Sequence, residues 1–361
     1  MQNSGLQPEK RLLTPEAEAH KKKVLAAVER LHKIEHVCRH FPLTWGAEKR
    51  QIYIAEALDA RRKLFVTSLV FAVQFLWSGA TPEDFDFRYI PEFYWELDYL
   101  RFYRNRHLRQ LILIPRGAGK TETLVVTETM QDAMREPDQT IGLCSGDLSL
   151  SMATLRTCRE IAETHTLFRD TFRPRLWDNP GKEAPRWNER GLQFKRNIVG
   201  RKEPTISAFS LSNNETGFHY TRQKIDDSVY AGNSTTEALL RDTAREISML
   251  EPILDPPVRK REQLFIGTRY DFRDAYGQMT ENPAFKCTVL PAVVVRSAEG
   301  AKPYKGPQDL ALASALGAEP LFPEMYSMED LFSMWTDSAS TEMFATQYML
   351  DPSGVNNPIF Q

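Results

Sequence analysis

Cysteine is scarce in this sequence, and its few occurrences are not grouped. The chain of 361 residues has four, at positions 38, 144, 158 and 287. None forms a C-x-x-C pair or has histidine neighbours at zinc spacing, which argues against a disulfide framework and a structural zinc site. We expect reduced thiols in the protein core, in a reducing compartment.

Long apolar runs are also missing. The segment "MQNSGLQPEKRLLTPE" has no apolar stretch of the kind that a secretion signal needs. The most apolar run, residues 64–77, is shorter than the roughly 20 residues of a membrane-spanning helix, so we expect a buried core helix and no membrane partner. The formal net charge of −2 does not exclude nucleic acid, because local clustering of Lys and Arg matters more than the total.

The first part of the chain predicts helices, after a segment at 1–13 that we interpret as flexible. Thr14 suits an N-cap and Pro15 the first helical position. Apolar residues then recur at helical spacing from 24 to 38, and a second helical region spans about 47–77. Histidines at 32, 36 and 40 share one helix face. With Lys and Arg around them and no carboxylate triad, an exposed face is favoured over a metal site.

From about residue 91 short apolar runs alternate with helical stretches, which is typical of an α/β domain with a mostly parallel central sheet flanked by helices. The candidate strands are "LILI" (111–114), "TIGLCSG" (140–146), "TISAFSL" (205–211), "QLFIGT" (263–268) and "CTVLPAVVV" (287–295). Helical patterns cover 149–165 and 235–254. The Pro-, Arg- and Trp-rich residues 174–204 are interpreted as an irregular or hairpin insertion.

The stretch "QLILIPRGAGKTETL" (110–124) has the parts of a phosphate-binding loop. In such a loop, backbone N–H groups hold the phosphates, a lysine reaches the β and γ oxygens, and a Ser or Thr holds Mg²⁺. Lys120 and Thr121 occupy those positions, and Gly117 and Gly119 permit close backbone approach. Ile114 stands where the standard pattern has glycine, and we interpret it as the end of the strand. The alternative is a chance glycine-rich turn.

An ATPase also needs one carboxylate for Mg²⁺ and a second that orients the attacking water. The candidate is "YTRQKIDDSV" (220–229), with Asp226 as the Mg²⁺-associated acid and Asp227 as the base. Residues 222–224 are more polar than a buried central strand should be. A helix N-cap or a turn is therefore an equally good interpretation of these two acids.

A third motif is "LFIGTRYDFRDAYGQM" (264–279), where an apolar strand ends in Gly-Thr-Arg. Ligands in α/β sheets bind at the carboxyl ends of parallel strands, so Thr268 is placed to sense a γ-phosphate. The alternative is a strand that ends in an ordinary turn.

Together the three motifs resemble the large subunit of tailed-bacteriophage terminase, the motor that packages DNA into the procapsid. "LILIPRGAGKTE" is similar to the family's variant phosphate-binding loop, "TGFHYTRQKIDDSV" to its acidic motif, and "FIGTRYDFRDAYGQM" to its coupling motif, in which Gly-Thr-Arg and a following Asp-x-Tyr recur. "LFPEMYSMEDL" and "FATQYMLDP" resemble the segments that close its ATPase domain. The resemblance spans about residues 91–352 and implies a P-loop NTPase of the ASCE/RecA-like class.

The resemblance also implies roles for single residues. Arg116 matches an arginine that acts in cis on the γ-phosphate, and Thr268 matches the residue that links hydrolysis to movement. Asp226 and Asp227 match the Mg²⁺-associated and catalytic acids, although many relatives have Glu as the second. The residues that we expect to contact ATP are Pro115, Arg116, Gly117, Ala118, Gly119, Lys120, Thr121 and Glu122. Tyr94 or Trp95 could stack on the adenine, although core packing is favoured for either one.

The partners implied are double-stranded DNA, a portal protein and a small terminase subunit, with ATP and Mg²⁺ at the site. A ring of five copies would work at the procapsid portal in the host cytoplasm, and the isolated chain could be a monomer. Ring motors of this kind often take an arginine from the neighbouring subunit, and the candidates are Arg222, Arg241, Arg245 and Arg269. The basic stretches "RFYRNRHLR" (101–109) and "PPVRKREQ" (256–263) are DNA contacts or solvated loops.

We predict a helical region at 1–88, packed on an ATPase domain at 89–352, and the start of a linker at 353–361. Full-length terminase large subunits carry a further RNase H-like nuclease domain, which would begin near the last of these residues. We therefore expect no nuclease activity from residues 1–361 themselves.

Three other functions compete. A helicase-like, nucleic-acid-dependent ATPase shares these motifs but needs a second α/β lobe, for which the residues after Thr268 lack a strand–helix series. A small-molecule P-loop kinase would need neither a coupling motif nor so large a helical region. A nucleotide-binding scaffold protein is the third alternative, if Asp226 and Asp227 are not a catalytic pair.

Overall fold

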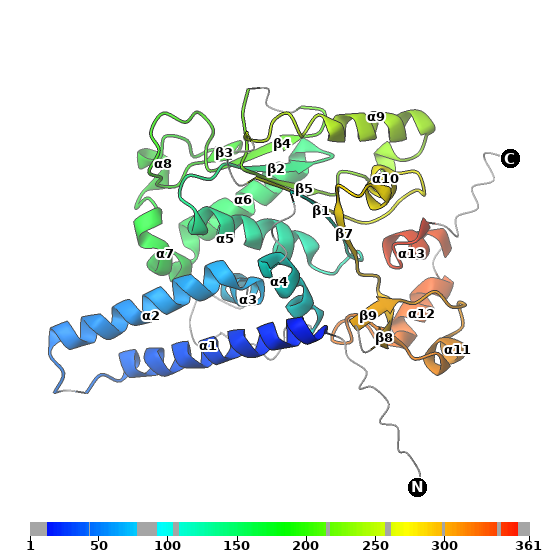
Figure 1. Cartoon of the computed structure of the whole chain (residues 1–361). Coiled ribbons are helices and arrows are strands. Elements are labelled where there is room, and N and C mark those ends of the chain that lie inside the picture. The colour runs from blue at the N-terminus through cyan, green and yellow to red at the C-terminus, as the bar shows by residue number, and fades with distance from the viewer. Residues whose placement is uncertain are drawn as a thin grey trace, which may run out of the picture.

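The computed structural model describes residues 13–42, 44–77, 92–103, 108–213, 217–256, 261–297, 300–337 and 341–352. At its centre is a seven-stranded sheet in the order β3-β4-β2-β5-β6-β1-β7, with helices on both faces (Figure 1). The predicted α/β class with a mostly parallel sheet and a helical N-terminal region is confirmed. The expected flexible segment, the linker and the boundary near residue 88 lie wholly or almost wholly outside the described residues.

The strands of this sheet are β1 (Arg109–Leu113), β2 (Ile141–Ser145), β3 (Gly191–Leu192), β4 (Ile206–Ser210), β5 (Arg222–Asp226), β6 (Glu262–Gly267) and β7 (Lys286–Val289). Only the β3–β4 pair within it is antiparallel. The predicted strand at 287–295 proves to be two, because Pro291, which has no N–H to donate, separates β7 from β8 (Val293–Ser297) in a second sheet.

The helices before β7 are α1 (Pro15–Arg39), α2 (Ala47–Thr67), α3 (Leu69–Trp77), α4 (Phe93–Tyr103), η3 (Thr121–Thr127), α5 (Glu128–Arg135), α6 (Leu148–Thr164), α7 (Thr166–Phe172), η4 (Arg173–Arg175), α8 (Pro180–Glu183), η5 (Ala231–Asn233), α9 (Glu237–Ser248) and α10 (Ala275–Glu281). The helical region predicted at 47–77 is thus interrupted at Ser68. Buried Asp98 accepts hydrogen bonds there from the Ser68 hydroxyl and from the N–H of Leu69, and so starts a new helix.

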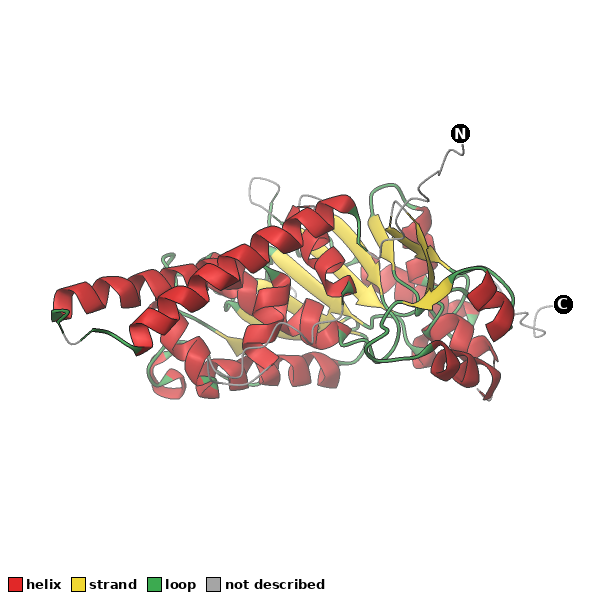
Figure 2. Ribbon diagram, turned by 90° about the horizontal axis from the view of Figure 1, so that it is seen from below, coloured by secondary structure: helices red, strands yellow, loops and turns green. Residues whose placement is uncertain are grey.

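Helix α1 begins as predicted, with the Thr14 side chain accepting from the N–H of Ala17 and Pro15 in the first turn. Its apolar stripe is buried, whereas the histidines at 32, 36 and 40 are exposed. Helices α1 and α2 form a long antiparallel pair that extends from the body of the molecule (Figure 2). Within the described residues, no helix is both long and apolar enough to cross a membrane. All four cysteines are free.

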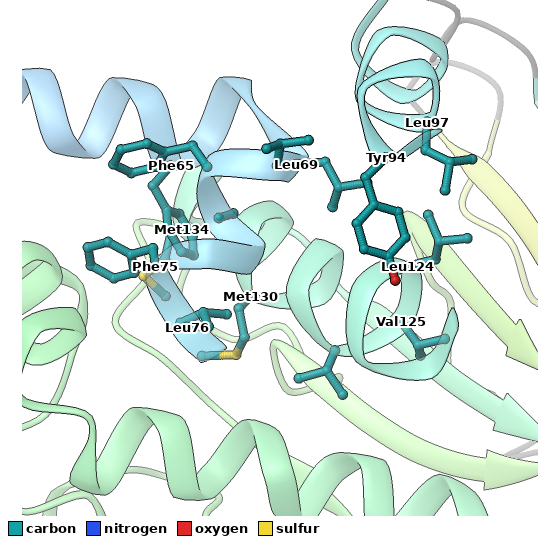
Figure 3. Packing of buried hydrophobic residues seen from close by; sticks show 14 of the residues in the cluster. Phe65, Leu69, Phe75, Leu76, Tyr94, Leu97, Leu124, Val125, Met130 and Met134 are labelled. Atoms are coloured by element: carbon teal, nitrogen blue, oxygen red, sulfur yellow. The ribbon is translucent and has the colours of Figure 1, made fainter. Parts of the chain in front are cut away.

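Alternation along the strands divides the core into two layers. Ile112 and Ile114 belong to the cluster formed with α1–α7 and η3, whereas Leu111 and Leu113 belong to the cluster on the α9–α10 face. Figure 3 shows part of the first cluster, where side chains of α2, α3 and α4 meet those of η3 and α5. The sheet is therefore buried on both faces, as a parallel sheet requires.

The chain ends in a small unit that the sequence did not reveal. Its elements are β8, β9 (Gly300–Pro303), α11 (Leu310–Ala315), β10 (Ala318–Pro320), α12 (Met328–Asp337) and α13 (Thr341–Gln347). The three strands form an antiparallel sheet in the order β10-β8-β9, and they share a separate apolar cluster with these helices. We call this group the C-terminal unit.

The polar strand β5 is fully buried, and its charges are paired. The ammonium group of Lys224 contacts Glu128 and lies 3.3 Å from an oxygen of Asp132, both on α5. Burial raises the pKa of Asp132, but the charges of Arg222 and Lys224 outweigh it and lower that pKa to about 2.

Neighbouring elements extend these pairs into one network, the buried ionic cluster. Arg222 binds Glu262 of β6, and Arg101 of α4 binds both Glu262 and Glu128. The cluster thus joins α4, α5, β5 and β6. The polar side chains of residues 222–224 argued against a central strand, but the charged ones are paired with acids distant in sequence.

Removing one partner from this cluster leaves an uncompensated buried charge. We expect Lys224→Met to lower the free energy of unfolding by about 3–5 kcal/mol. The matched control is Lys33→Met, which breaks an exposed i,i+4 pair with Glu29 and should leave the free energy of unfolding nearly unchanged. Urea unfolding compares the two, and equal midpoints would count against a structural role for the cluster.

Candidate functional site

The glycine-rich loop, residues 114–120, connects β1 to η3 at the carboxyl edge of the sheet. Ile114 is buried and its N–H donates to the carbonyl of Gly267, so it continues β1 as the sequence suggested. Gly117 and Gly119 have φ values of +79° and +66°, in the left-handed region that favours glycine. The two glycines thus let the loop curl back over the start of η3.

Two of the residues assigned to Mg²⁺ are in direct contact. The Thr121 hydroxyl, at the start of η3, donates to Oδ2 of Asp226 at 2.7 Å. Asp226 is the last residue of β5, and β6 lies between that strand and β1. The loop therefore reaches across one strand to bring Thr121 to the acid, and the strand interpretation of residues 222–226 holds.

Asp227 follows immediately and is held in an unusual conformation. Its φ of +44° is uncommon for a residue other than glycine, and its N–H donates to the carbonyl of Ile266. The Lys120 ammonium group lies 3.4 Å from its Oδ2. Lys120, Thr121, Asp226 and Asp227 thus form one contact group.

The acid pair carries more negative charge than its surroundings balance. Oδ1 of Asp226 and Oδ1 of Asp227 are buried, and neither has a hydrogen-bond partner among the described residues. Burial raises the pKa of Asp226 to about 7, and the charge of Asp227 adds to this. A divalent cation would relieve both the unpaired oxygens and the like-charge repulsion.

These residues fit Mg²⁺ better than a metal with an all-protein ligand set. In the described part of the chain, no three His, Cys, Asp or Glu side chains group as metal ligands. Mg²⁺ is usually held through one or two carboxylates, with water and substrate phosphates completing its shell. Thr121 and Asp226 could supply such a partial set.

A cleft of about 350 Å³ opens beside the acids. Trp77 of α3, Leu150 of α6 and Thr121 line it together with Asp226 and Asp227. The acid pair is therefore reachable from outside.

Other residues assigned to ATP lie around the loop. The side chains of Arg116 and Glu122 are exposed. Thr268 is buried at the end of β6, and its hydroxyl donates to Oε1 of Gln347 at 3.1 Å. Thr268 thus lies at the same sheet edge as the loop. Its hydroxyl is already hydrogen-bonded to Gln347, a contact that the sequence did not predict.

Tyr94 supports the loop from behind. Its hydroxyl donates to the carbonyl of Ala118 at 2.8 Å, and its ring lies beside Leu124 in the apolar core (Figure 3). Burial raises the pKa of Tyr94, which keeps this donor protonated. Trp95 is buried too. Both side chains are thus part of the protein core, and stacking of either one on the adenine stays a prediction.

Two of the four candidate trans arginines are unsuited to that role. Arg222 is part of the buried ionic cluster, and Arg269 is buried against Asp274. Arg241 and Arg245 are exposed on α9. Both basic stretches include residues outside the described part of the chain, so DNA contacts by these stretches stay a prediction.

Tyr276 was quoted in the sequence motif but was not identified as a site residue. The N–H of Ser228 donates to its hydroxyl at 3.0 Å, and this hydroxyl donates to the carbonyl of Ile266 at 3.1 Å. The ring lies so close to Gly267 that a Cβ there would come within 2.6 Å of it. Tyr276 therefore holds the residue after Asp227 and also the Ile266 carbonyl to which the N–H of Asp227 donates. The Asp-x-Tyr recurrence was the available signal.

Asp226 should make stability depend on pH. Its folded-state pKa of about 7 exceeds the ordinary 3.8, so its ionisation opposes folding increasingly as the pH rises from about 4 to about 7. We expect Asp226→Asn to raise the Tm at about pH 8, by a margin that shrinks toward pH 5. Thermal unfolding at several pH values tests this, beside the exposed Asp242→Asn as control. A margin that is constant or grows toward low pH would contradict it.

Comparison with known proteins assigns no family. A scan against protein-family models finds no match to the chain, and a search of curated proteins finds none either. What the site does must therefore be inferred from its own residues.

Proposed function

We propose that the chain is an ATP-hydrolysing motor domain of the terminase large-subunit type, which moves double-stranded DNA into a procapsid through a portal. The carrying observation is the contact group at the sheet edge, where Thr121 meets Asp226 at 2.7 Å and Lys120 meets Asp227 at 3.4 Å. The sequence motifs predict that all four residues take part in one reaction, ATP hydrolysis.

Each residue has a task in this proposal. Backbone N–H groups of the loop and the Lys120 ammonium group bind the phosphates of ATP, with Arg116 beside them. Thr121 and Asp226 would hold Mg²⁺, which supplies positive charge to the phosphate oxygens. Asp227 orients the attacking water and accepts its proton. Binding of phosphate would draw Lys120 away from Asp227 and free this carboxylate to act as the base.

The strand order supports an ASCE/RecA-like P-loop fold. With β6 between β1 and β5, Thr268 stands between the loop and the acids, as a residue that senses hydrolysis should. A helicase of the two-lobe type is less well supported, because the described residues after β7 form a small antiparallel sheet. The expected partners remain double-stranded DNA, the portal protein, the small subunit and further copies in a ring.

The site assignment is tested by substitution. We expect Lys120→Ala to abolish ATP hydrolysis, and Asp227→Asn to keep ATP binding while lowering kcat by about 100-fold or more. Lys182→Ala, at an exposed lysine of α8, is the control that should hydrolyse normally. Phosphate release and nucleotide titration measure the two effects. Normal turnover in either site variant would reject the assignment.

DNA dependence tests the motor. We expect double-stranded DNA to stimulate hydrolysis without strand unwinding, and the stimulation to fall steeply with salt because phosphate contacts dominate such binding. Phosphate release with and without DNA, run beside an unwinding assay, measures this. Unwinding would favour the helicase-like ATPase, and binding of nucleotide without hydrolysis would favour a scaffold.

A further inference from the structure

Gln347, the last residue of α13, touches both segments that flank the proposed ATP site. Its Oε1 accepts from the Thr268 hydroxyl at 3.1 Å, and its Nε2 donates to the carbonyl of Arg269 at 2.6 Å. Its backbone carbonyl accepts from the N–H of Arg116 at 3.1 Å. One buried glutamine of the C-terminal unit therefore holds the end of β6 and the start of the glycine-rich loop together.

Further contacts place the C-terminal unit against the same loop. The hydroxyl of Tyr326 lies 3.1 Å from where a Cβ on Gly117 would stand. Burial raises the pKa of Tyr348, and the nearby charge of Arg116 opposes this rise. The side-chain amide of Gln347 makes one hydrogen bond as acceptor and one as donor, and both are to residues that directly follow β6.

We propose that Gln347 is a positioning residue that couples the C-terminal unit to the nucleotide site. Its amide sets where the Thr268 hydroxyl points, and its carbonyl sets where the loop begins at Arg116. A change in the loop on ATP binding then moves the end of α13. A displacement of the C-terminal unit likewise changes the loop, because coupling between two sites is reciprocal. This proposal rests on the proposed function for its catalytic consequence.

A matched glutamine separates positioning from ordinary packing. Gln131 on α5 is equally buried, and its Nε2 donates to the carbonyls of Phe65 at 2.6 Å and Ser68 at 3.0 Å. Gln347→Leu and Gln131→Leu each remove two side-chain hydrogen bonds. Those of Gln347 are to residues beside the proposed site, whereas those of Gln131 are to α2 and Ser68.

The first experiment needs no nucleotide. Hydrogen exchange of the Arg116 and Thr268 amides is compared in the wild type, Gln347→Leu and Gln131→Leu, each corrected for its global stability. We expect Gln347→Leu to speed exchange at these amides by about fivefold or more, as loss of one or two hydrogen bonds implies. Equal local exchange in the two variants would overturn the link, whether or not the protein hydrolyses ATP.

The second experiment measures hydrolysis. We expect Gln347→Leu to lower kcat about five- to tenfold with KM changed less than about twofold, and Gln131→Leu to leave both near wild type. Gln347→Glu, which keeps an acceptor for Thr268 but loses the donor to Arg269, should fall between, and it replaces Gln347→Leu if that variant does not fold.

A double-mutant cycle with Thr268→Val completes the test. If Gln347 acts through Thr268, the double variant should lose little more activity than Thr268→Val alone. Full additivity, or a Gln347→Leu enzyme with normal kcat, would overturn the coupling while hydrolysis by the wild type leaves the proposed function standing. A wild type that never hydrolyses ATP would refute the proposed function, and the exchange measurement would still decide the link.

Discussion

The buried ionic cluster constrains the register of the central strand, and the site depends on that register. Lys224 and Arg222 lie in β5, where an unpaired charge would be very costly. Their acidic partners come from α5 and β6. A slip of one residue would move both basic side chains to the other face of the sheet and separate them from Glu128, Asp132 and Glu262. The strand is thus locked in place by charge as well as by its backbone hydrogen bonds.

The same alternation carries the constraint to the proposed catalytic edge. Because side chains alternate along a strand, Asp226 points to the same face as Lys224, and this is the face on which η3 and α5 lie. There it meets Thr121. The chain then turns sharply at Asp227, whose left-handed backbone is secured by Ile266 and by the Tyr276 hydroxyl next to it. Electrostatic pairing at one end of β5 and local strain at the other thus position two adjacent carboxylates that repel each other. Burial raises the pKa of Asp226 and the charge of Asp227 adds to this, so a further cation or a proton would stabilise the pair.

The sheet supplies most of this site but not all of it. The C-terminal unit has its own apolar cluster and its own antiparallel sheet, and its Val294, Leu321 and Phe322 also join the main core cluster. Beside this apolar packing, which includes Ala118 of the loop, the unit contacts the loop and the end of β6 through polar groups of Gln347 and through Tyr326. Polar contacts of this kind are directional and contribute modest free energy. They therefore suit a junction that positions the loop and can still change when the C-terminal unit moves.

The sequence by itself determined the α/β class, most strands, the start of α1 and the glycine-rich loop, because these follow from local patterns: apolar periodicity, capping residues, and glycine next to Lys120. It indicated the two acids as candidates only. Tertiary structure decided the rest. The sequence left residues 222–226 open between strand and turn, since nothing local shows that Glu128, Asp132 and Glu262 will neutralise them. It placed Thr268 correctly at a strand end and included Gln347 in the segment "FATQYMLDP", but it did not indicate that these two residues, 79 apart, would be in contact. It also read β7 and β8 as one strand. Pairing over such distances depends on which elements become neighbours, and only the folded chain brings them together.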